Sequence, residues 1–286
     1  MSVYRNFNQV ELDKQYNVRG GIPDYQDIFS RWSSTSAAFR KANRVIENVP
    51  YGSNETQNLD FFPAATAGRP LLVFIHGGYW QSLDKSDFSY IAEPYIKNDI
   101  NVAVVNYRLA PSVGMDEIVA DNRDALIWLY RNAESLAFDK DKIFLSGHSA
   151  GGHLTATMVS TDWNAHGLPA DVLKGACAIS GLYDLEPIRL CYLNKAVGLT
   201  AEQVAAYSPA RKLPNVKTPI ILTVGGDESD EYHRLQAEYA ALLGSKNMEI
   251  QIVDQIDGHH FDAVDRLGDE ENELGKAMLN LIRRYS

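Results

Sequence analysis

The chain has 286 residues, 45% of them hydrophobic, and a formal net charge of −10. This length and apolar content are enough for one α/β domain. No Pro/Gly/Ser-rich linker or charge block divides the sequence, so we predict a single domain over residues 1–286. The acidic balance disfavours nucleic acid and anionic membrane surfaces as partners, because both attract clustered Lys and Arg.

The first residues lack the apolar segment of a signal peptide, and no apolar run approaches the roughly 20 residues that span a bilayer. The two cysteines, Cys177 and Cys191, lack the spacing of metal ligands. We therefore expect a cytoplasmic protein. A homodimer is a common default for such chains, but no feature of the sequence specifies one.

The amino-terminal part of the chain precedes the first predicted strand. Residues 1–43 are polar and aromatic, with helical stretches around residues 24–39, and we expect them to fold over the site as part of a cap. Two short strand patterns follow at residues 45–49 and 59–62, separated by a turn-forming Pro-Tyr-Gly-Ser-Asn run. This pair predicts an antiparallel hairpin.

Beyond residue 70, continuous apolar runs alternate with amphipathic ones. The apolar runs at residues 71–75 and 102–105 are typical of strands covered on both faces. Further strands are predicted at residues 143–145, 176–179, 220–224 and 250–253. Helices are predicted at residues 116–130, 152–159, 232–243 and 274–283. The alternation predicts an α/β fold with a mostly parallel central sheet and helices on both faces. Residues 181–213 interrupt it and are too long for a plain connection, so we expect them to form the second part of the cap.

The strongest motif is GHSAG at residues 147–151, directly after a predicted strand and before a predicted helix. It matches the G-x-S-x-G nucleophile elbow, a tight turn that lifts the serine hydroxyl above the sheet edge. Glycine is needed there because flanking side chains would collide in the turn. The motif therefore predicts Ser149 as the nucleophile of an α/β-hydrolase fold.

A second motif, HGGYW at residues 76–80, also follows a predicted strand. HGGG-type loops at this place supply an N–H of the oxyanion hole, because glycines let the backbone approach a substrate oxygen. Each well-aimed donor stabilises the transition state by about 3 kcal/mol. We expect His76 to brace the loop rather than transfer protons. The amides expected to hold the oxyanion are those of Gly78, Tyr79 and Ala150, with Gly77 as a further candidate.

The catalytic acid should follow the strand at residues 220–224, because triad members on this fold occur in the order serine, acid, histidine. Asp227 and Glu228 are adjacent there. Many members of this fold place the acid three residues after the glycine that ends this strand, and counting from Gly225 gives Glu228. Asp227 is the second choice.

The base should follow the last strand, where His259 and His260 are adjacent. A metal site built from these two histidines and Asp262 is a rival interpretation. It would need at least one more ligand, and it would leave the nucleophile elbow unexplained. We therefore favour a histidine base and expect no metal and no organic cofactor.

Taken together, these segments resemble the kynurenine formamidase (arylformamidase) family. The resemblance is carried by LDKQY from residue 12, HGGYWQS from residue 76, NYRLA from residue 106, GHSAGGHL from residue 147, EYHR from residue 231 and HFD from residue 260. It implies that His260, which precedes Phe-Asp, is the base. It also implies that the acid lies three residues before EYHR, at Glu228, where many relatives carry Asp. The oxyanion amides implied are those of Gly78 and Tyr79.

The resemblance implies hydrolysis of N-formylkynurenine to formate and kynurenine through an acyl-serine. A carboxylesterase for short acyl esters would use the same catalytic residues and is the main alternative. A ligand-binding protein on an inactive hydrolase scaffold is a remote one, because the serine, the acid and the histidine are all present. The substrate is expected to be a small-molecule ester or amide with an aromatic group. Its aryl group would be held by cap and loop aromatics: Trp32, Tyr79, Trp80, Tyr183 and Phe261.

Overall fold

The computed structural model describes residues 2–286, and within them eight strands form one sheet in the order β1-β2-β4-β3-β5-β6-β7-β8. From β3 onward every neighbouring pair is parallel, whereas β2 runs antiparallel to both β1 and β4. The strands are β1 (Ile46–Pro50), β2 (Asn58–Phe62), β3 (Arg69–Ile75), β4 (Asn101–Val105), β5 (Phe138–His148), β6 (Leu173–Ile179), β7 (Ile220–Gly225) and β8 (Ile250–Gln255). The predicted hairpin and the mostly parallel sheet are confirmed.

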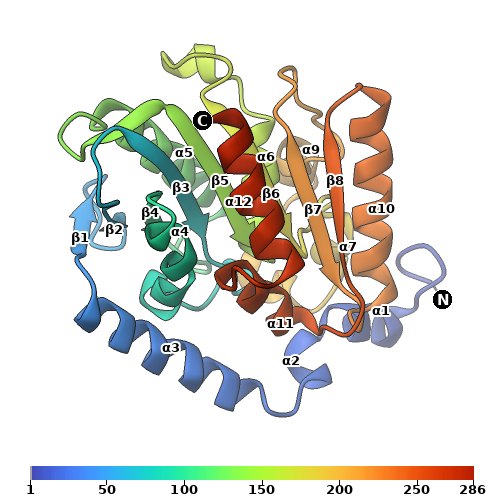
Figure 1. Cartoon of the computed structure of the whole chain (residues 1–286). Helices are drawn as coiled ribbons and strands as arrows, with labels where there is room; N and C mark the ends of the chain where they lie inside the picture. Colours follow the sequence, from blue (N-terminus) through green and yellow to red (C-terminus); the bar gives the residue numbers. More distant parts are fainter. Residues whose placement is uncertain (1) are drawn as a thin grey trace.

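Helices cover both faces of this sheet, as Figure 1 shows. The larger ones are α3 (Tyr25–Ala42), α5 (Met115–Arg131), α6 (Ala150–Val159), α10 (Asp230–Ser245) and α12 (Glu273–Tyr285). The shorter ones are α1 (Gln9–Tyr16), α2 (Val18–Gly21), α4 (Glu93–Lys97), α7 (Glu186–Leu190), α8 (Asn194–Val197), α9 (Ala201–Tyr207) and α11 (His260–Asp265). Within residues 2–286 the structure also has four short 3-10 helices: η1 (Lys85–Asp87), η2 (Ser89–Ala92), η3 (Trp163–His166) and η4 (Arg266–Gly268).

The central strands β3, β4, β6 and β7 are buried on both faces along nearly their whole length. Successive side chains of a strand point to opposite sides, so each of these strands contributes to two hydrophobic layers. Along β3, Leu71 and Val73 enter one hydrophobic cluster, while Leu72 and Phe74 enter the other. Burial of one such side chain stabilises the fold by roughly 1.5–3 kcal/mol. The continuous apolar runs of the central strands, such as residues 71–75 and 102–105, therefore reflect strands that have no solvent-facing side.

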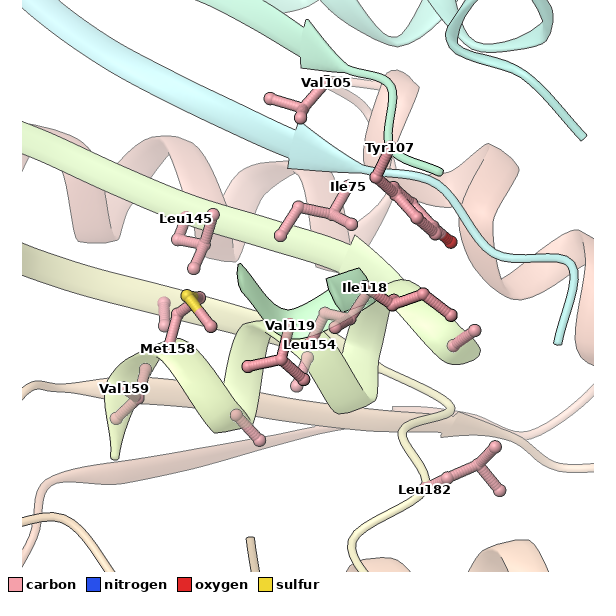
Figure 2. Packing of buried hydrophobic residues seen from close by; sticks show 14 of the residues in the cluster. Ile75, Val105, Tyr107, Ile118, Val119, Leu145, Leu154, Met158, Val159 and Leu182 are labelled. Carbon is pink, nitrogen blue, oxygen red and sulfur yellow. The ribbon is translucent and has the colours of Figure 1, made fainter. Parts of the chain in front are cut away.

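One of the two clusters lies between the sheet and the helices α5 and α6. Figure 2 shows Leu154 of α6 and Ile118 of α5 near Ile75 and Leu145 of the sheet. This packing holds α6 against the carboxyl ends of β3 and β5. The first turn of α6 is thereby fixed relative to the strand ends.

Two local features differ from the sequence-based expectation. Strand β5 begins at Phe138 rather than at residue 143, and residues 139–142 within it form a charged stretch that is half-buried or exposed. That stretch carries no apolar signal, so periodicity missed it. Helix α11 was not predicted, because it is short and its N-cap is the side chain of His259, which is not among the residues preferred at that position.

The amino-terminal helices lie at the end of the sheet to which the strands β5 to β8 point (Figure 1). Helix α3 packs against η1 and η2, and α1 packs against α10. No helix within residues 2–286 is both long and apolar enough to cross a membrane.

Candidate active site

Ser149 occupies the single position between β5 and α6, with φ 57° and ψ −114°. This left-handed backbone costs about 1–3 kcal/mol and persists only where the surroundings enforce it. Two neighbouring glycines make the turn possible. A Cβ atom added to Gly147 would lie 2.3 Å from the Gly151 carbonyl oxygen, and one added to Gly151 would lie 2.0 Å from the Ile75 carbonyl oxygen. The local packing therefore requires glycine on both sides of the serine.

Glu228 and His260 meet at the carboxyl ends of β7 and β8. The Nδ1 atom of His260 lies 2.6 Å from Oε2 of Glu228. The other carboxylate oxygen accepts a hydrogen bond of 2.7 Å from the Gly225 amide and one from the Ser180 hydroxyl. The side chain of Glu228 is 1% exposed and that of His260 is 5% exposed. These hydrogen bonds hold the buried carboxylate in one orientation, in which its Oε2 atom faces the imidazole.

The adjacent alternatives lie elsewhere. Asp227 is exposed, and its amide donates to the Gly258 carbonyl. His259 caps helix α11: its Nδ1 atom accepts a hydrogen bond of 3.0 Å from the Asp262 amide. The structure thus brings Glu228 and His260 together and leaves Asp227 and His259 apart from that pair.

His148, the residue before the serine, packs against His260. The centroids of the two rings are 4.5 Å apart, and His148 Nε2 lies 2.9 Å from the backbone oxygen of His260. Because a carbonyl only accepts, Nε2 of His148 carries the proton and donates. Burial, and secondarily the charge that His260 can carry, lower the pKa of His148 well below its ordinary value. His148 is therefore a neutral support for the backbone of His260.

The glycine loop after β3 lies beside Ser149. Gly78 has φ 102° and Tyr79 has φ 50°, and a Cβ atom at Gly78 would lie 2.1 Å from the Ser82 carbonyl oxygen. Both residues line the same cavity as Ser149, and within residues 2–286 neither of their amides donates a hydrogen bond. Gly77 lies deeper, where an added Cβ would approach the His148 carbonyl oxygen to 2.9 Å. The Ala150 amide is the first of α6 and has no acceptor within the helix.

His76, the first residue of this loop, is held by residues that follow β4. Its Nε2 atom lies 3.1 Å from Asn106 Oδ1, and its ring stacks on Tyr107 with centroids 4.5 Å apart. His76 is fully buried, and burial lowers the pKa of its imidazole. These contacts tie the loop to the chain that follows β4.

Two adjoining cavities meet at His260. The smaller has a volume of about 20 Å³ and contains Ser149; its other lining residues are Val18, Arg19, Phe29, Trp32, Gly78, Tyr79, Leu83, His148, His260 and Phe261. The larger has a volume of about 460 Å³ and shares Val18 and His260 with the first; its other lining residues are Lys14, Gln15, Asn17, Gly21, Ile22, Pro23, Asp24, Asp227, Glu228, Ser229, Tyr232 and His259. A small slot at the serine thus borders a roomier cavity, and Val18 and His260 line both.

Two residues expected to contact substrate lie in the core instead. Trp80 is fully buried, with its ring edge-on to His153 at a centroid distance of 5.1 Å. Tyr183 is also fully buried and stacks on Tyr239 at 4.3 Å. Neither lines the two cavities at His260. The expectation that they bind substrate is corrected, because tertiary packing turns both rings inward.

Of the other expected aromatics, Tyr79, Trp32 and Phe261 do line the slot. Residues that sequence reasoning missed include Arg19 and Phe29 in the slot and Tyr232 in the larger cavity. Tyr232 lies in the EYHR run, but no spacing rule placed its side chain near the serine. Helix α2, which carries Arg19, is too short to give a periodic signal.

Comparison with known proteins places the chain among hydrolases. The BD-FAE family model matches residues 59–181. Kynurenine formamidase from Danio rerio is 30% identical, with 99% of this chain and 99% of that protein covered. The Salmo salar kynurenine formamidase is 29% identical, with the same coverage of 99% and 99%. A solved structure from Silicibacter sp. tm1040, provisionally described as a thioesterase, superposes with a TM-score of 0.82 at 28% identity, covering 94% of this chain and 99% of that chain.

Proposed function

The chain belongs to the kynurenine formamidase family, and from this premise we propose that it hydrolyses N-formylkynurenine to formate and kynurenine. It is a serine hydrolase of the α/β-hydrolase fold, and its substrate is a small molecule. The observation that carries the choice of substrate is the pairing of a slot of about 20 Å³ at Ser149 with an adjoining cavity of about 460 Å³. Such a site suits a small acyl group on a large leaving group.

The reaction begins at the serine. Ser149 Oγ attacks the formyl carbon, and His260 takes the serine proton on Nε2. His260 then gives this proton to the nitrogen of the leaving amine, and the carbon–nitrogen bond breaks. His260 then takes a proton from a water molecule that attacks the formyl-serine. It returns this proton to Ser149 Oγ as the acyl–oxygen bond breaks and formate is released. The hydrogen bond of 2.6 Å from His260 Nδ1 to Glu228 fixes the tautomer that leaves Nε2 free for these transfers.

The oxyanion that forms at each addition step is held by backbone amides. We assign this role to Gly78 and Tyr79 of the glycine loop and to Ala150 at the start of α6. Support comes from the free amides of Gly78 and Tyr79 and from their place in the lining of the slot. The amino end of α6 adds a favourable dipole. Gly77 serves the close packing of the loop against His148.

The slot limits the acyl group. A volume of about 20 Å³ is close to the smallest cavity that holds one water molecule, and three of the walls are the bulky side chains of Phe29, Trp32 and Phe261. Phe261 is edge-on to Trp32 at 5.6 Å and to Phe29 at 5.1 Å, so the rings brace one another. The formyl group carries only a hydrogen beside its carbonyl and is the smallest acyl group. It therefore suits this small slot better than longer acyl groups do.

Arg19 supports a substrate that carries a carboxylate, as N-formylkynurenine does. Its Nη2 atom donates a hydrogen bond of 2.7 Å to Ser82, and its guanidinium lies 5.3 Å from the centroid of Phe29. No carboxylate within residues 2–286 forms an ion pair with it. A fixed guanidinium without a counter-ion at the rim of the slot is suited to an anionic group.

We further propose that the whole chain is one domain and that residues 1–43 and 181–213 form a cap over its site. Residues 14–24 supply much of the wall of the larger cavity, which supports this role for the first segment. The 181–213 segment carries α7, α8 and α9, and the Tyr192 amide donates to Asp13 of the first segment at 2.8 Å. The two segments are therefore in direct contact.

We also propose a cytoplasmic protein that acts without nucleic-acid or membrane partners and without a cofactor, and a homodimer as its assembly. The unpaired state of Cys177 and Cys191 supports a reducing compartment. Size-exclusion chromatography coupled to light scattering tests the assembly.

The second candidate function is a carboxylesterase for short acyl esters, which the same triad would support. A solved carboxylesterase cloned from a metagenomic library shares the fold at 20% identity and a TM-score of 0.70, a level that speaks for the fold alone. The test is a comparison of kcat/KM for N-formylkynurenine and for p-nitrophenyl acetate, with the Ser149→Ala variant as control. A higher kcat/KM for the formamide, lost by about a thousandfold or more in the variant, supports the proposal. If only the ester is turned over, the carboxylesterase function replaces the proposed formamidase function.

A further inference from the structure

Three tyrosines form a chain of hydrogen bonds beside the catalytic residues. The Tyr79 hydroxyl donates to the Tyr16 carbonyl oxygen at 2.8 Å, and it lies 2.7 Å from the Tyr232 hydroxyl. A phenol has one proton, and a carbonyl oxygen can only accept. The Tyr79 proton is therefore committed to Tyr16, and Tyr232 must be the donor in its contact with Tyr79. This accounting leaves the Tyr232 oxygen available only as an acceptor.

The direction of the chain is fixed at its far end. Tyr16 is fully buried, and its own hydroxyl donates to Glu231 at 3.1 Å. Glu231 is held in turn by Arg234 at 2.7 Å, so the segment that carries the Tyr16 carbonyl is anchored. Burial raises the pKa of Tyr79 and of Tyr232 above the ordinary value for a phenol. Both hydroxyls keep their protons near neutral pH, and the order of donors and acceptors is retained.

Tyr232 stands on the side of the active site where the leaving group departs. It lines the larger cavity together with Glu228 and His260, and its ring is edge-on to His260 at a centroid distance of 5.1 Å. Its hydroxyl oxygen lies 2.7 Å from the hydroxyl of Tyr79, which lines the slot together with Ser149. Tyr232 thus contacts the imidazole that protonates the leaving atom.

We propose that the Tyr232 oxygen accepts a hydrogen bond from the N–H of the scissile amide and so makes the site selective for amides over esters. The inference rests on the proposed function, whose leaving atom is a nitrogen that carries a hydrogen. When the nitrogen lone pair turns toward His260 to receive its proton, the N–H must find an acceptor on another side, and Tyr232 provides one. An ester presents an oxygen lone pair at the same place, which an acceptor cannot satisfy.

The experiment compares Tyr232→Phe with the full-length wild-type protein on a matched pair of substrates, formanilide and phenyl formate. Phenylalanine keeps the ring against His260 and removes only the acceptor. We expect kcat/KM for formanilide to fall by about tenfold or more, while kcat/KM for phenyl formate stays within about twofold. Tyr239→Phe is the control, because it makes the same change in the same helix α10, and the Tyr239 hydroxyl, buried and without a partner within residues 2–286, lies outside both cavities.

An equal fall for both substrates would overturn the inference, since it would mean that Tyr232 donates to the oxyanion or only positions Ser149. No change in kcat/KM for either substrate would overturn it as well. The proposed function fails differently: the wild-type protein would then cleave phenyl formate but neither formanilide nor N-formylkynurenine. Failure of the inference alone leaves the wild-type amide turnover intact.

Discussion

The backbone amide of Gly225 donates a hydrogen bond of 2.7 Å to Oε1 of Glu228, three residues further along the chain. The turn that joins them is closed by a second bond, from the Glu228 amide to the Gly225 carbonyl at 3.0 Å. The chain thus folds the glutamate side chain back over the end of β7. One carboxylate oxygen is held by the backbone, and the other faces His260.

This arrangement predicts the effect of Glu228→Gln. The amide can donate to Nδ1 of His260 and so favour the wrong tautomer, which should lower kcat by about a thousandfold to ten-thousandfold. The matched control is Asp227→Asn, which removes the neighbouring exposed carboxylate and should leave kcat within about threefold. Steady-state kinetics on N-formylkynurenine measures both. A larger loss in the Asp227 variant would assign the acid to that residue instead.

The size of the slot predicts a steep dependence on acyl length. In the series p-nitrophenyl formate, acetate and butyrate, kcat/KM should fall by about tenfold or more from the shortest to the longest, because added carbons meet Phe29 and Trp32. Phe29→Ala should raise the butyrate-to-formate ratio. Phe39→Ala, in the same helix α3 but packed against Phe62, should leave that ratio unchanged. A flat profile in the wild-type protein would contradict a restrictive slot.

Arg19 should recognise the carboxylate of the substrate. Arg19→Gln is expected to raise KM for N-formylkynurenine by about tenfold or more, with little change in kcat. KM for formanilide, which has no carboxylate, should not change. Lys14→Gln is the comparison, because Lys14 lines the larger cavity. If that variant raises KM and Arg19→Gln does not, the anionic group lies in the larger cavity.

A buried histidine should make stability depend on pH. Burial lowers the pKa of His153 to about 4, and Nε2 of this residue lies 2.8 Å from the Tyr207 carbonyl oxygen. The unfolded chain, in which histidine has a pKa of about 6.5, takes up the proton more readily. The full stability is therefore present above about pH 6.5 and is lost as the pH falls toward 4, by about 3 kcal/mol at most from this residue.

Urea unfolding at pH 7.5 and pH 5 tests this dependence. His153→Gln removes the titrating group and keeps a donor for the Tyr207 carbonyl, so its loss of stability between the two pH values should be smaller by about 2 kcal/mol. His166→Gln, at a half-buried surface position, is the control and should follow the wild-type protein. Equal losses in all three proteins would contradict a neutral, buried His153.

The sequence by itself predicted the sheet and the nucleophile. The central strands were recognisable because burial on both faces leaves no polar position, as along β3. Ser149 was recognisable because its turn depends on neighbours in sequence: Gly147 and Gly151 have no room for a Cβ. Both signals are local, and local constraints can be read from residue order.

Spacing and resemblance favoured one member of each adjacent pair, and the tertiary structure decided how the chosen side chains are aimed. Asp227 and Glu228 have equal charge and differ by one position, and only the turn after β7 aims the second at His260. Long-range packing also turned Trp80 and Tyr183 into the core. The width of the slot and the hydrogen-bond order at Tyr232 depend on segments far apart in the chain. Such features arise from contacts between elements, which periodicity and motif spacing do not encode.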